Sequence, residues 1–301
     1  MMNRPIGFIA NAIEIGTAFT GLLDTYTGAG IAAGVRRLSS TYTGPLMRII
    51  RASDSTVSDI GYDTSGHLDT AAISTFCSGT TGYILYLYDQ SGNGYNVIGY
   101  NSGSTTDNLP VIYTGSAVVT VNGKSAIRIH HPRWFRWTNN EASMSKFYTG
   151  GAAGADKRAT IHFVGAQSSS VSSPYKISIE DITALEYLAM YEDTSAERID
   201  FGGSSAANLG TPATYRDDIQ SYFISQVEGN AWKFIETGSL IYTSTNTIAQ
   251  VATKVGISFY IGSRTFAGQN IDAYLQELIV WPTAYSASAL WSDVNTYYSI
   301  G

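Results

Sequence analysis

Apolar and polar residues alternate along most of this chain, and the alternation predicts its fold. Successive side chains of a strand point to opposite faces, so alternation is typical of a sheet with one buried face. The predicted strands cover residues 48–52, 83–88, 118–121, 126–130, 160–165, 221–227, 232–236, 240–243, 255–261 and 274–281. Thr237 and Gly238 favour a hairpin turn between two of these strands.

Helical spacing of apolar residues is found in three segments, 28–38, 69–76 and 286–298. In the first, Ile31, Val35 and Leu38 recur at the spacing of a helix face, and Asp69 is a typical N-cap for the second. Many evenly spaced strands with short turns and few helices predict an all-β protein, a two-sheet antiparallel sandwich.

Composition narrows the class of protein further. The 301 residues are 44% hydrophobic and only 14% charged, which suffices for a sizeable core and is the opposite of a disordered composition. A formal net charge of −6 and the lack of any run of Lys or Arg argue against nucleic acid as a partner. The single cysteine, Cys77, excludes an internal disulfide, and we expect it to be buried.

Residues 1–21 are modestly apolar and carry no helical caps, so we expect an N-terminal arm ahead of one domain at 22–301. The arm either adds a strand to the domain's sheet or anchors it on a partner chain. Its expected anchoring residues are Ile6, Phe8, Ile9 and Ile13. A single Arg4 followed by Pro5, with Glu14 inside the apolar run, is not typical of a signal peptide. We also expect no membrane insertion, because no stretch of roughly 18 apolar residues occurs.

The segment Tyr88–Gly94 packs an acid, two amides, a hydroxyl and two glycines into one turn after a predicted strand. Asp89 and Asn93 offer the hard oxygen ligands that Ca²⁺ prefers, so this loop is a candidate for structural calcium, the one cofactor that we consider. The alternative, which we favour, is a turn stabilised by its own side chains.

Aromatic and basic residues gather near the end of another predicted strand, at Trp134, Phe135, Arg136 and Trp137. Three uses remain open for them. They could pack in the core, form a subunit interface, where Trp and Arg are favoured, or bind carbohydrate by stacking on sugar rings.

Several short motifs occur in a fixed order, mostly within residues 22–129. They are Leu23–Ala29, Val35–Ser40, Tyr42–Arg48, Arg51–Asp54, Asp59–Asp63, Gly66–Ala72, Tyr88–Gly94, Val121–Ala126 and, near the end of the chain, Leu275–Val280. In this order they resemble the catalytic domain of the B-type α-L-arabinofuranosidases, a module that also occurs in bacteriophage tail-fibre and other virion proteins. The resemblance implies a jelly-roll sandwich of the laminin-G or concanavalin A type.

A glycosidase of the retaining class needs two carboxyl groups about 5 to 5.5 Å apart. The acids in the middle of the chain are Glu180, Asp181, Glu186, Glu192, Asp193 and Glu197, and none sits in a recognisable motif. The resemblance also implies a pocket lined by a bond between two adjacent cysteines, which a chain with one cysteine cannot form. We therefore assign no catalytic residue and expect that the chain is not an enzyme.

These expectations combine into a bacteriophage virion protein, made in the host cytoplasm, as a tail fibre, spike or capsid decoration. It would be a homo-oligomer that contacts other virion proteins through residues 1–21 and binds a host-surface glycan. The alternative is an arabinofuranosidase-type glycoside hydrolase, which would bring two carboxyls together beside aromatic residues. A third interpretation is a free lectin with an exposed aromatic platform.

Overall fold

The computed structural model describes the backbone of thirteen segments. They are residues 19–101, 109–130, 133–143, 159–167, 175–181, 186–193, 196–201, 205–208, 221–228, 231–236, 239–244, 255–261 and 272–300. Side chains are described at 19–100, 109–130, 133–137, 159–166, 261 and 273–300. Residues 1–18, with the expected anchoring residues Ile6, Phe8, Ile9 and Ile13, lie outside the described part.

Strands dominate the described chain, and three helices accompany them. The helices are α1 (Leu22–Thr25), α2 (Thr70–Phe76) and α3 (Ala287–Tyr298). The strands of the first half are β1 (Ile31–Gly34), β2 (Met47–Arg51), β3 (Val57–Ile60), β4 (Thr81–Leu87), β5 (Val97–Asn101), β6 (Val111–Thr114), β7 (Thr120–Val121), β8 (Lys124–Ser125), β9 (Ile127–His130) and β10 (Arg133–Ser143). The others are β11 (Ala159–Gln167), β12 (Tyr175–Asp181), β13 (Glu186–Asp193), β14 (Ala196–Phe201), β15 (Ser205–Asn208), β16 (Ser221–Glu228), β17 (Ala231–Glu236), β18 (Ser239–Ser244), β19 (Val255–Ile261) and β20 (Asp272–Trp281).

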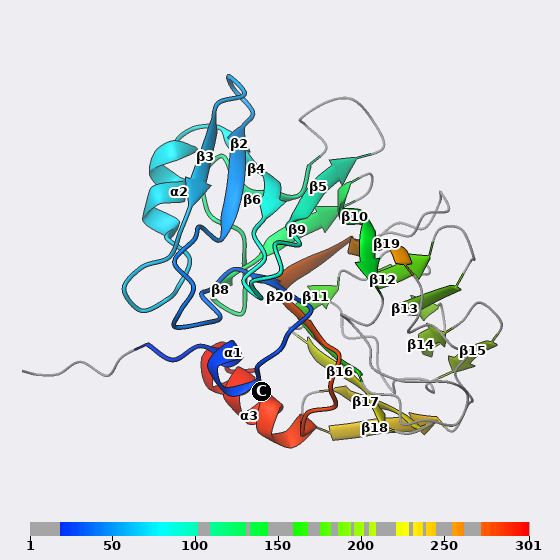
Figure 1. The fold of residues 1–301 in the computed structure, drawn as a ribbon. Helices are drawn as coiled ribbons and strands as arrows, with labels where there is room; N and C mark the ends of the chain where they lie inside the picture. Colours follow the sequence, from blue (N-terminus) through cyan, green and yellow to red (C-terminus); the bar gives the residue numbers. More distant parts are fainter. Residues whose placement is uncertain are drawn as a thin grey trace, which may run out of the picture.

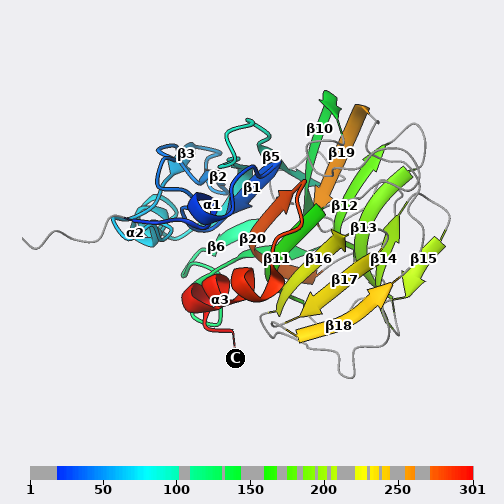
Figure 2. The same ribbon diagram turned by 60° about the horizontal axis from the view of Figure 1, so that its bottom comes forward.

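The strands form two layers that separate at β4. One edge of β4 pairs with β2, and the other pairs with β6 at one end and with β5 at the other. From β5 the first layer continues through β10, β19, β12, β13, β14 and β15. From β6 the second continues through β9, β20, β11, β16, β17 and β18. Figure 2 shows both series, and their antiparallel pairing confirms the expected all-β sandwich.

The largest apolar cluster joins strands from both layers. Fully buried members include Ile49 of β2, Ile84 of β4, Phe135 of β10 and Leu278 of β20. A second cluster lies under α3, where Leu290, Val294, Tyr298 and Trp281 are completely buried; Figure 1 shows α3 beside α1. The two ends of the described chain therefore share one apolar core.

Two of the three predicted helices are confirmed. The Asp69 carboxylate accepts a hydrogen bond from the Ala72 backbone N–H at 2.9 Å and so caps α2, as its sequence position indicates. Cys77 ends this helix and is fully buried, as expected. The α3 helix occupies the third predicted segment.

The helix predicted within 28–38 is wrong. Residues 31–34 form β1 instead, which pairs antiparallel with residues 277–280 of β20. All four residues of β1 are buried, so apolar residues at helical spacing here belong to a strand covered on both faces. Backbone pairing with β20 outweighs the local periodicity, which cannot distinguish a short buried strand from a helix.

Candidate functional site

A fully buried carboxylate, Glu277, organises the interior beside α3. Arg36 binds it in bidentate fashion, with Nε to Oε2 at 2.5 Å and Nη2 to Oε1 at 3.2 Å. The His162 Nε2 lies 2.7 Å from Oε1, and the Tyr298 hydroxyl donates to Oε2 at 3.1 Å. Three residues, from the segment after β1, from β11 and from α3, thus meet at one carboxylate of β20.

The charges of this cluster are fixed by mutual contact. Burial raises the pKa of Glu277, but the Arg36 charge and the hydrogen bond to His162 outweigh it and lower that pKa to about 2. Burial lowers the pKa of His162 and outweighs the opposing effect of Glu277, so the imidazole is neutral near pH 7. The cluster is therefore an ion pair of Arg36 and Glu277 with a neutral histidine beside it.

Asp89, the first expected calcium ligand, is directed into its own turn. Its Oδ1 accepts hydrogen bonds from the backbone N–H groups of Ala32 and Ser91, each at 2.9 Å. Its Oδ2 accepts from the Ser91 hydroxyl at 2.7 Å and from the Tyr95 N–H at 2.9 Å. Both carboxylate oxygens are thus used within the fold, Oδ1 to hold the loop against β1 and Oδ2 to hold the loop together.

Asn93, the second expected ligand, acts in the same way. Its amide donates to the carbonyl oxygens of Ala29 and Gly30 at 2.9 and 3.0 Å. Gly92 and Gly94 supply the positive φ values, 87° and 77°, that the turn needs. No group of three or more His, Cys, Asp or Glu residues suited to a metal ion occurs within the described segments.

The loop Tyr88–Gly94 and the segments around α1 line an open cavity of about 310 Å³. Its polar lining is neutral, with hydroxyls from Thr27, Ser39 and Thr41 and the amide of Gln90. The Gln90 side chain is already committed, since it accepts from the Leu38 N–H and donates to the Arg36 carbonyl. The side chains of the Tyr88–Gly94 motif thus serve to hold this loop against residues 29–38.

The expected glycan or interface residues divide between the two faces of β10. Phe135 is fully buried, and Trp137, exposed by 6%, packs in the same core cluster. Trp134 lies on the opposite face, with its ring 5.0 Å from that of Tyr100. Arg136 lies there too, with its guanidinium 3.7 Å above the Tyr100 ring. They do not form a single aromatic platform, because neighbouring residues of a strand alternate between faces.

Strand register brings acidic residues together twice in the first layer. In the β12–β13 ladder Asp181 lies directly opposite Glu186, and in the β13–β14 ladder Glu192 lies opposite Glu197. Directly opposite residues of an antiparallel pair share a face, with their Cβ atoms about 4.5 to 5.5 Å apart. These are the carboxyl pairs that the backbone of the described chain assembles.

The row that contains Asp181 and Glu186 continues across the sheet to Ile257 of β19 and Asn139 of β10. The next row on the same face is entirely apolar and aromatic: Trp137, Phe259, Ile179, Leu188 and Phe201. Trp137, the one described side chain of this row, is buried. In the backbone register the acid pair thus stands one row away from a row of apolar and aromatic residues.

Sequence reasoning missed the buried cluster around Glu277. A signal for it exists, because Glu277 is the only charged residue between Tyr274 and Trp281 in a run that otherwise alternates as a strand. Neither Arg36 nor His162 has a comparable signal, since their meeting depends on which strands become neighbours.

Comparison with known families gives a match for the first half of the chain. The model for the catalytic domain of α-L-arabinofuranosidase B matches residues 25–176, about half of the sequence. The α-L-arabinofuranosidase B of Aspergillus oryzae is 33% identical over 149 residues, which are 46% of this chain and 29% of that protein. The α-L-arabinofuranosidase of Hypocrea jecorina is 35% identical over 133 residues, 41% of this chain and 27% of that protein.

Solved structures extend the similarity of fold to most of the chain. A structure of an arabinofuranosidase complexed with arabinofuranosyl-α-1,2-xylobiose has a TM-score of 0.65 at 20% identity. A mutant GH54 α-L-arabinofuranosidase soaked with 4-nitrophenyl α-L-arabinofuranoside has the same score and identity. Each alignment covers 88% of this chain and 62% of the other. This chain thus spans less than a third of the length of these curated relatives and less than two thirds of the solved chains.

These matches overturn the virion interpretation. The matched family and relatives are arabinofuranosidases, and the relatives are fungal, so the expected tail-fibre, spike or decoration role and the virion location are wrong. The expected virion partners and the expectation of a non-enzymatic chain are contradicted by the same finding. The motifs did not distinguish an enzyme from a virion protein, because residues such as Asp89 and Asn93 stabilise loops and take no part in catalysis that their contacts show.

Proposed function

Because this chain belongs to the family of α-L-arabinofuranosidase B catalytic domains, we propose that it hydrolyses α-L-arabinofuranosides. The observation that carries the proposal is the family match over residues 25–176, together with a similarity of fold that covers 88% of the chain. A jelly-roll fold by itself is shared by binding proteins and enzymes, so the family match supplies the choice of reaction.

We assign the reaction to Asp181 and Glu186. The β12–β13 ladder places these two acidic residues directly opposite each other, and a retaining glycosidase needs two carboxyl groups roughly 5 to 5.5 Å apart. The match to the family ends at residue 176, so this assignment rests on register. In a retaining mechanism one carboxylate attacks the anomeric carbon while the other, protonated, gives its proton to the leaving oxygen. Water then hydrolyses the glycosyl-enzyme, with the second group as base.

Two acidic residues directly opposite each other suit this division of labour. Like charges directly opposite each other destabilise a sheet. When one of two close carboxyls holds a proton, the repulsion is relieved and an acid and a nucleophile are present together. Glu192 and Glu197 are the matched control pair. They also lie directly opposite each other, in the β13–β14 ladder, but Glu192 lies beyond the part of β13 that pairs with β12.

Release of nitrophenol from 4-nitrophenyl α-L-arabinofuranoside by the purified chain is the test. We expect turnover, and we expect Asp181→Asn and Glu186→Gln each to lower kcat by about 10² to 10⁴-fold, the usual contribution of acid–base groups. Glu192→Gln and Glu197→Gln should retain near-complete activity. No turnover by the unaltered, folded chain would refute the proposed function. Turnover that depends on the Glu192 pair would refute only the assignment of residues.

A further inference from the structure

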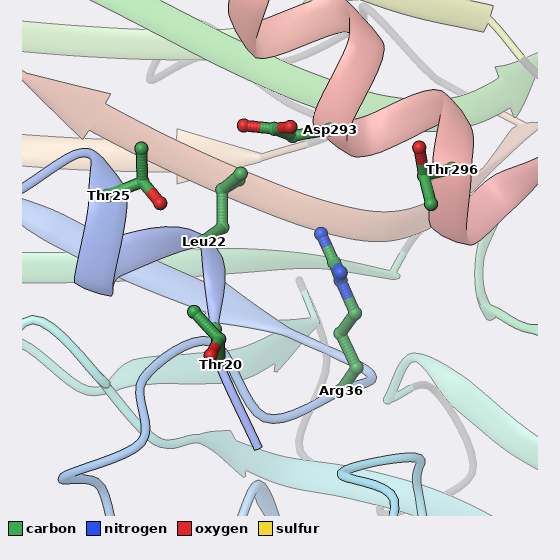
Figure 3. Close-up of a pocket in the computed structure, with 7 residues that line it drawn as sticks. Thr20, Leu22, Thr25, Arg36, Asp293 and Thr296 are labelled. Atoms are coloured by element: carbon green, nitrogen blue, oxygen red, sulfur yellow. The ribbon is translucent and has the colours of Figure 1, made fainter. Parts of the chain in front are cut away.

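A second cavity, of about 220 Å³, lies between α1 and α3 and is lined by polar side chains that the proposed hydrolysis does not use. Figure 3 shows Arg36 directed into the space between Leu22 and α3, with Asp293 and Thr296 on the helix side and Thr20 and Thr25 opposite. Every described residue that lines it lies in α1 or just before it, in α3, or just after β1.

Arg36 is the decisive residue of this cavity. It is exposed by only 9%, and its guanidinium is fixed by Glu277 and by the Tyr297 ring, whose centroid lies 4.3 Å away. Those contacts occupy Nε and Nη2, and no acceptor among the described residues takes the N–H groups of Nη1. A buried guanidinium held rigidly, with donors left over beside a cavity, is a preformed binding group.

Asp293 supplies the complementary acceptor. One carboxylate oxygen accepts a hydrogen bond from the Tyr26 hydroxyl at 2.9 Å, and the other has no donor in the described part of the chain. The Thr20 and Thr25 hydroxyls can both donate and accept, whereas the Thr296 hydroxyl already donates to the Ser292 carbonyl at 2.8 Å and can still accept. Since Arg36 is already neutralised by Glu277, the charges around the cavity sum to −1, which disfavours a bound anion.

These properties select a small neutral ligand with several hydroxyl groups. Such a ligand donates to Asp293, accepts from Arg36 and exchanges hydrogen bonds with threonines, while Leu22 contacts its C–H side. The volume of about 220 Å³ is small, which suits one monosaccharide better than a longer glycan. We propose that this cavity binds a single neutral sugar unit, at a site separate from the carboxyl pair.

The site is inferred from its own residues and does not require that the chain hydrolyse arabinofuranosides. Binding is therefore measured without turnover, by NMR titration of the full chain carrying Glu186→Gln, with L-arabinose and with inorganic phosphate as probes. We expect saturable binding of the sugar and none of the phosphate.

Cavity variants then locate the binding. Asp293→Asn can keep the bond from Tyr26 but removes the charge, and Thr25→Val removes a hydroxyl while keeping the shape, so neither should disturb folding. Each should weaken sugar binding by about tenfold, the equivalent of one hydrogen bond to a charged or polar group. Ser292→Ala, an exposed change on α3 outside the cavity lining, is the matched control and should leave binding unchanged.

Three outcomes would overturn the site. They are absence of sugar binding, sugar binding unaffected by Asp293→Asn and Thr25→Val, and preferential binding of phosphate. If sugar binding instead disappears with Asp181→Asn, the carboxyl pair accounts for it, and the proposed function survives while this site does not.

Discussion

At the residue scale, Glu277 and Asp59 are two carboxylates that each pair with an arginine, one in the protein interior and one at the surface. Both form bidentate contacts with an arginine, Glu277 with Arg36 and Asp59 with Arg48. The Glu277 side chain is fully buried, whereas the Asp59 side chain is 39% exposed. Water can replace a lost partner at Asp59, but it does not reach the fully buried Glu277 carboxylate, so the buried pair should matter far more.

The amide substitution Glu277→Gln should lower the free energy of unfolding by about 3 to 5 kcal/mol, because it leaves the Arg36 charge buried without its counter-ion. Asp59→Asn is the matched control and should have a much smaller effect, as is usual for exposed pairs. Urea unfolding of both variants measures the difference. Equal losses would show that the two arginines are equally solvated.

His162 makes the stability depend on pH. Because its pKa is lower in the folded chain than its ordinary 6.5, the unfolded chain binds more protons below that pH. The stability contributed by its neutral form is therefore complete above about pH 6.5 and declines as the pH falls. Glu277, with a pKa of about 2 against an ordinary 4.5, adds a second loss at lower pH.

The urea midpoint should therefore fall between pH 7 and pH 5, and His162→Gln should remove most of that fall. Gln can still donate a hydrogen bond to Glu277 but does not titrate. His67→Gln is the control, since the His67 side chain is 49% exposed and is not part of the Glu277 cluster. A flat profile in the unaltered chain would contradict this account.

At the scale of elements, β1 shows how pairing decides between a helix and a strand. Its residues are Ile31, Ala32, Ala33 and Gly34, which have little strand preference as a group. An ideal Cβ on Gly34 would lie 3.0 Å from the Gln276 carbonyl oxygen, so a small residue permits the close approach of β20. The neighbouring strand thus determines the conformation of this segment.

Close approach of strands predicts which glycines resist substitution. In β5 an ideal Cβ on Gly99 would lie 2.1 Å from the Ile84 carbonyl oxygen, whereas a Cβ on Gly61 would meet nothing within 4 Å. Gly99→Ala should therefore destabilise the fold by roughly 1 to 3 kcal/mol through overpacking. Gly61→Ala should be neutral or stabilise it by about 0.4 to 1 kcal/mol. Thermal unfolding of the two variants compares them directly, and a tolerated Gly99→Ala would mean that β4 and β5 can separate.

At the scale of the whole molecule, the two ends of the described chain are joined. The Trp281 indole donates to the Tyr26 carbonyl at 2.9 Å, and β1 pairs with β20. The α3 helix covers this junction with Leu290, Val294 and Tyr298, all completely buried. No helix of the described segments is long and apolar enough to cross a bilayer.

A chain that ends at Thr283, without α3, should lose cooperative unfolding. Each of the three buried side chains contributes about 1.5 to 3 kcal/mol, and their sum approaches the total stability of about 5 to 15 kcal/mol of an ordinary domain. Limited proteolysis and near-ultraviolet circular dichroism would detect the loss. Ser288→Ala, an exposed change on the same helix, should have no such effect, and a cooperatively folded truncated chain would show that α3 is only an accessory.

The sequence alone determined the class of fold, α2, α3 and most of the strands, because alternation, helical spacing and the Asp69 cap are local properties. It also identified the family-like motifs, although it could not choose between their uses, because those residues hold turns such as the one around Asp89. Only the tertiary structure decided that β1 is a strand, that Arg36 and His162 meet Glu277, and that Asp181 lies opposite Glu186. The physical reason is common to all three: each depends on which strands pair and in what register, and pairing joins segments that carry no information about each other in their local sequence.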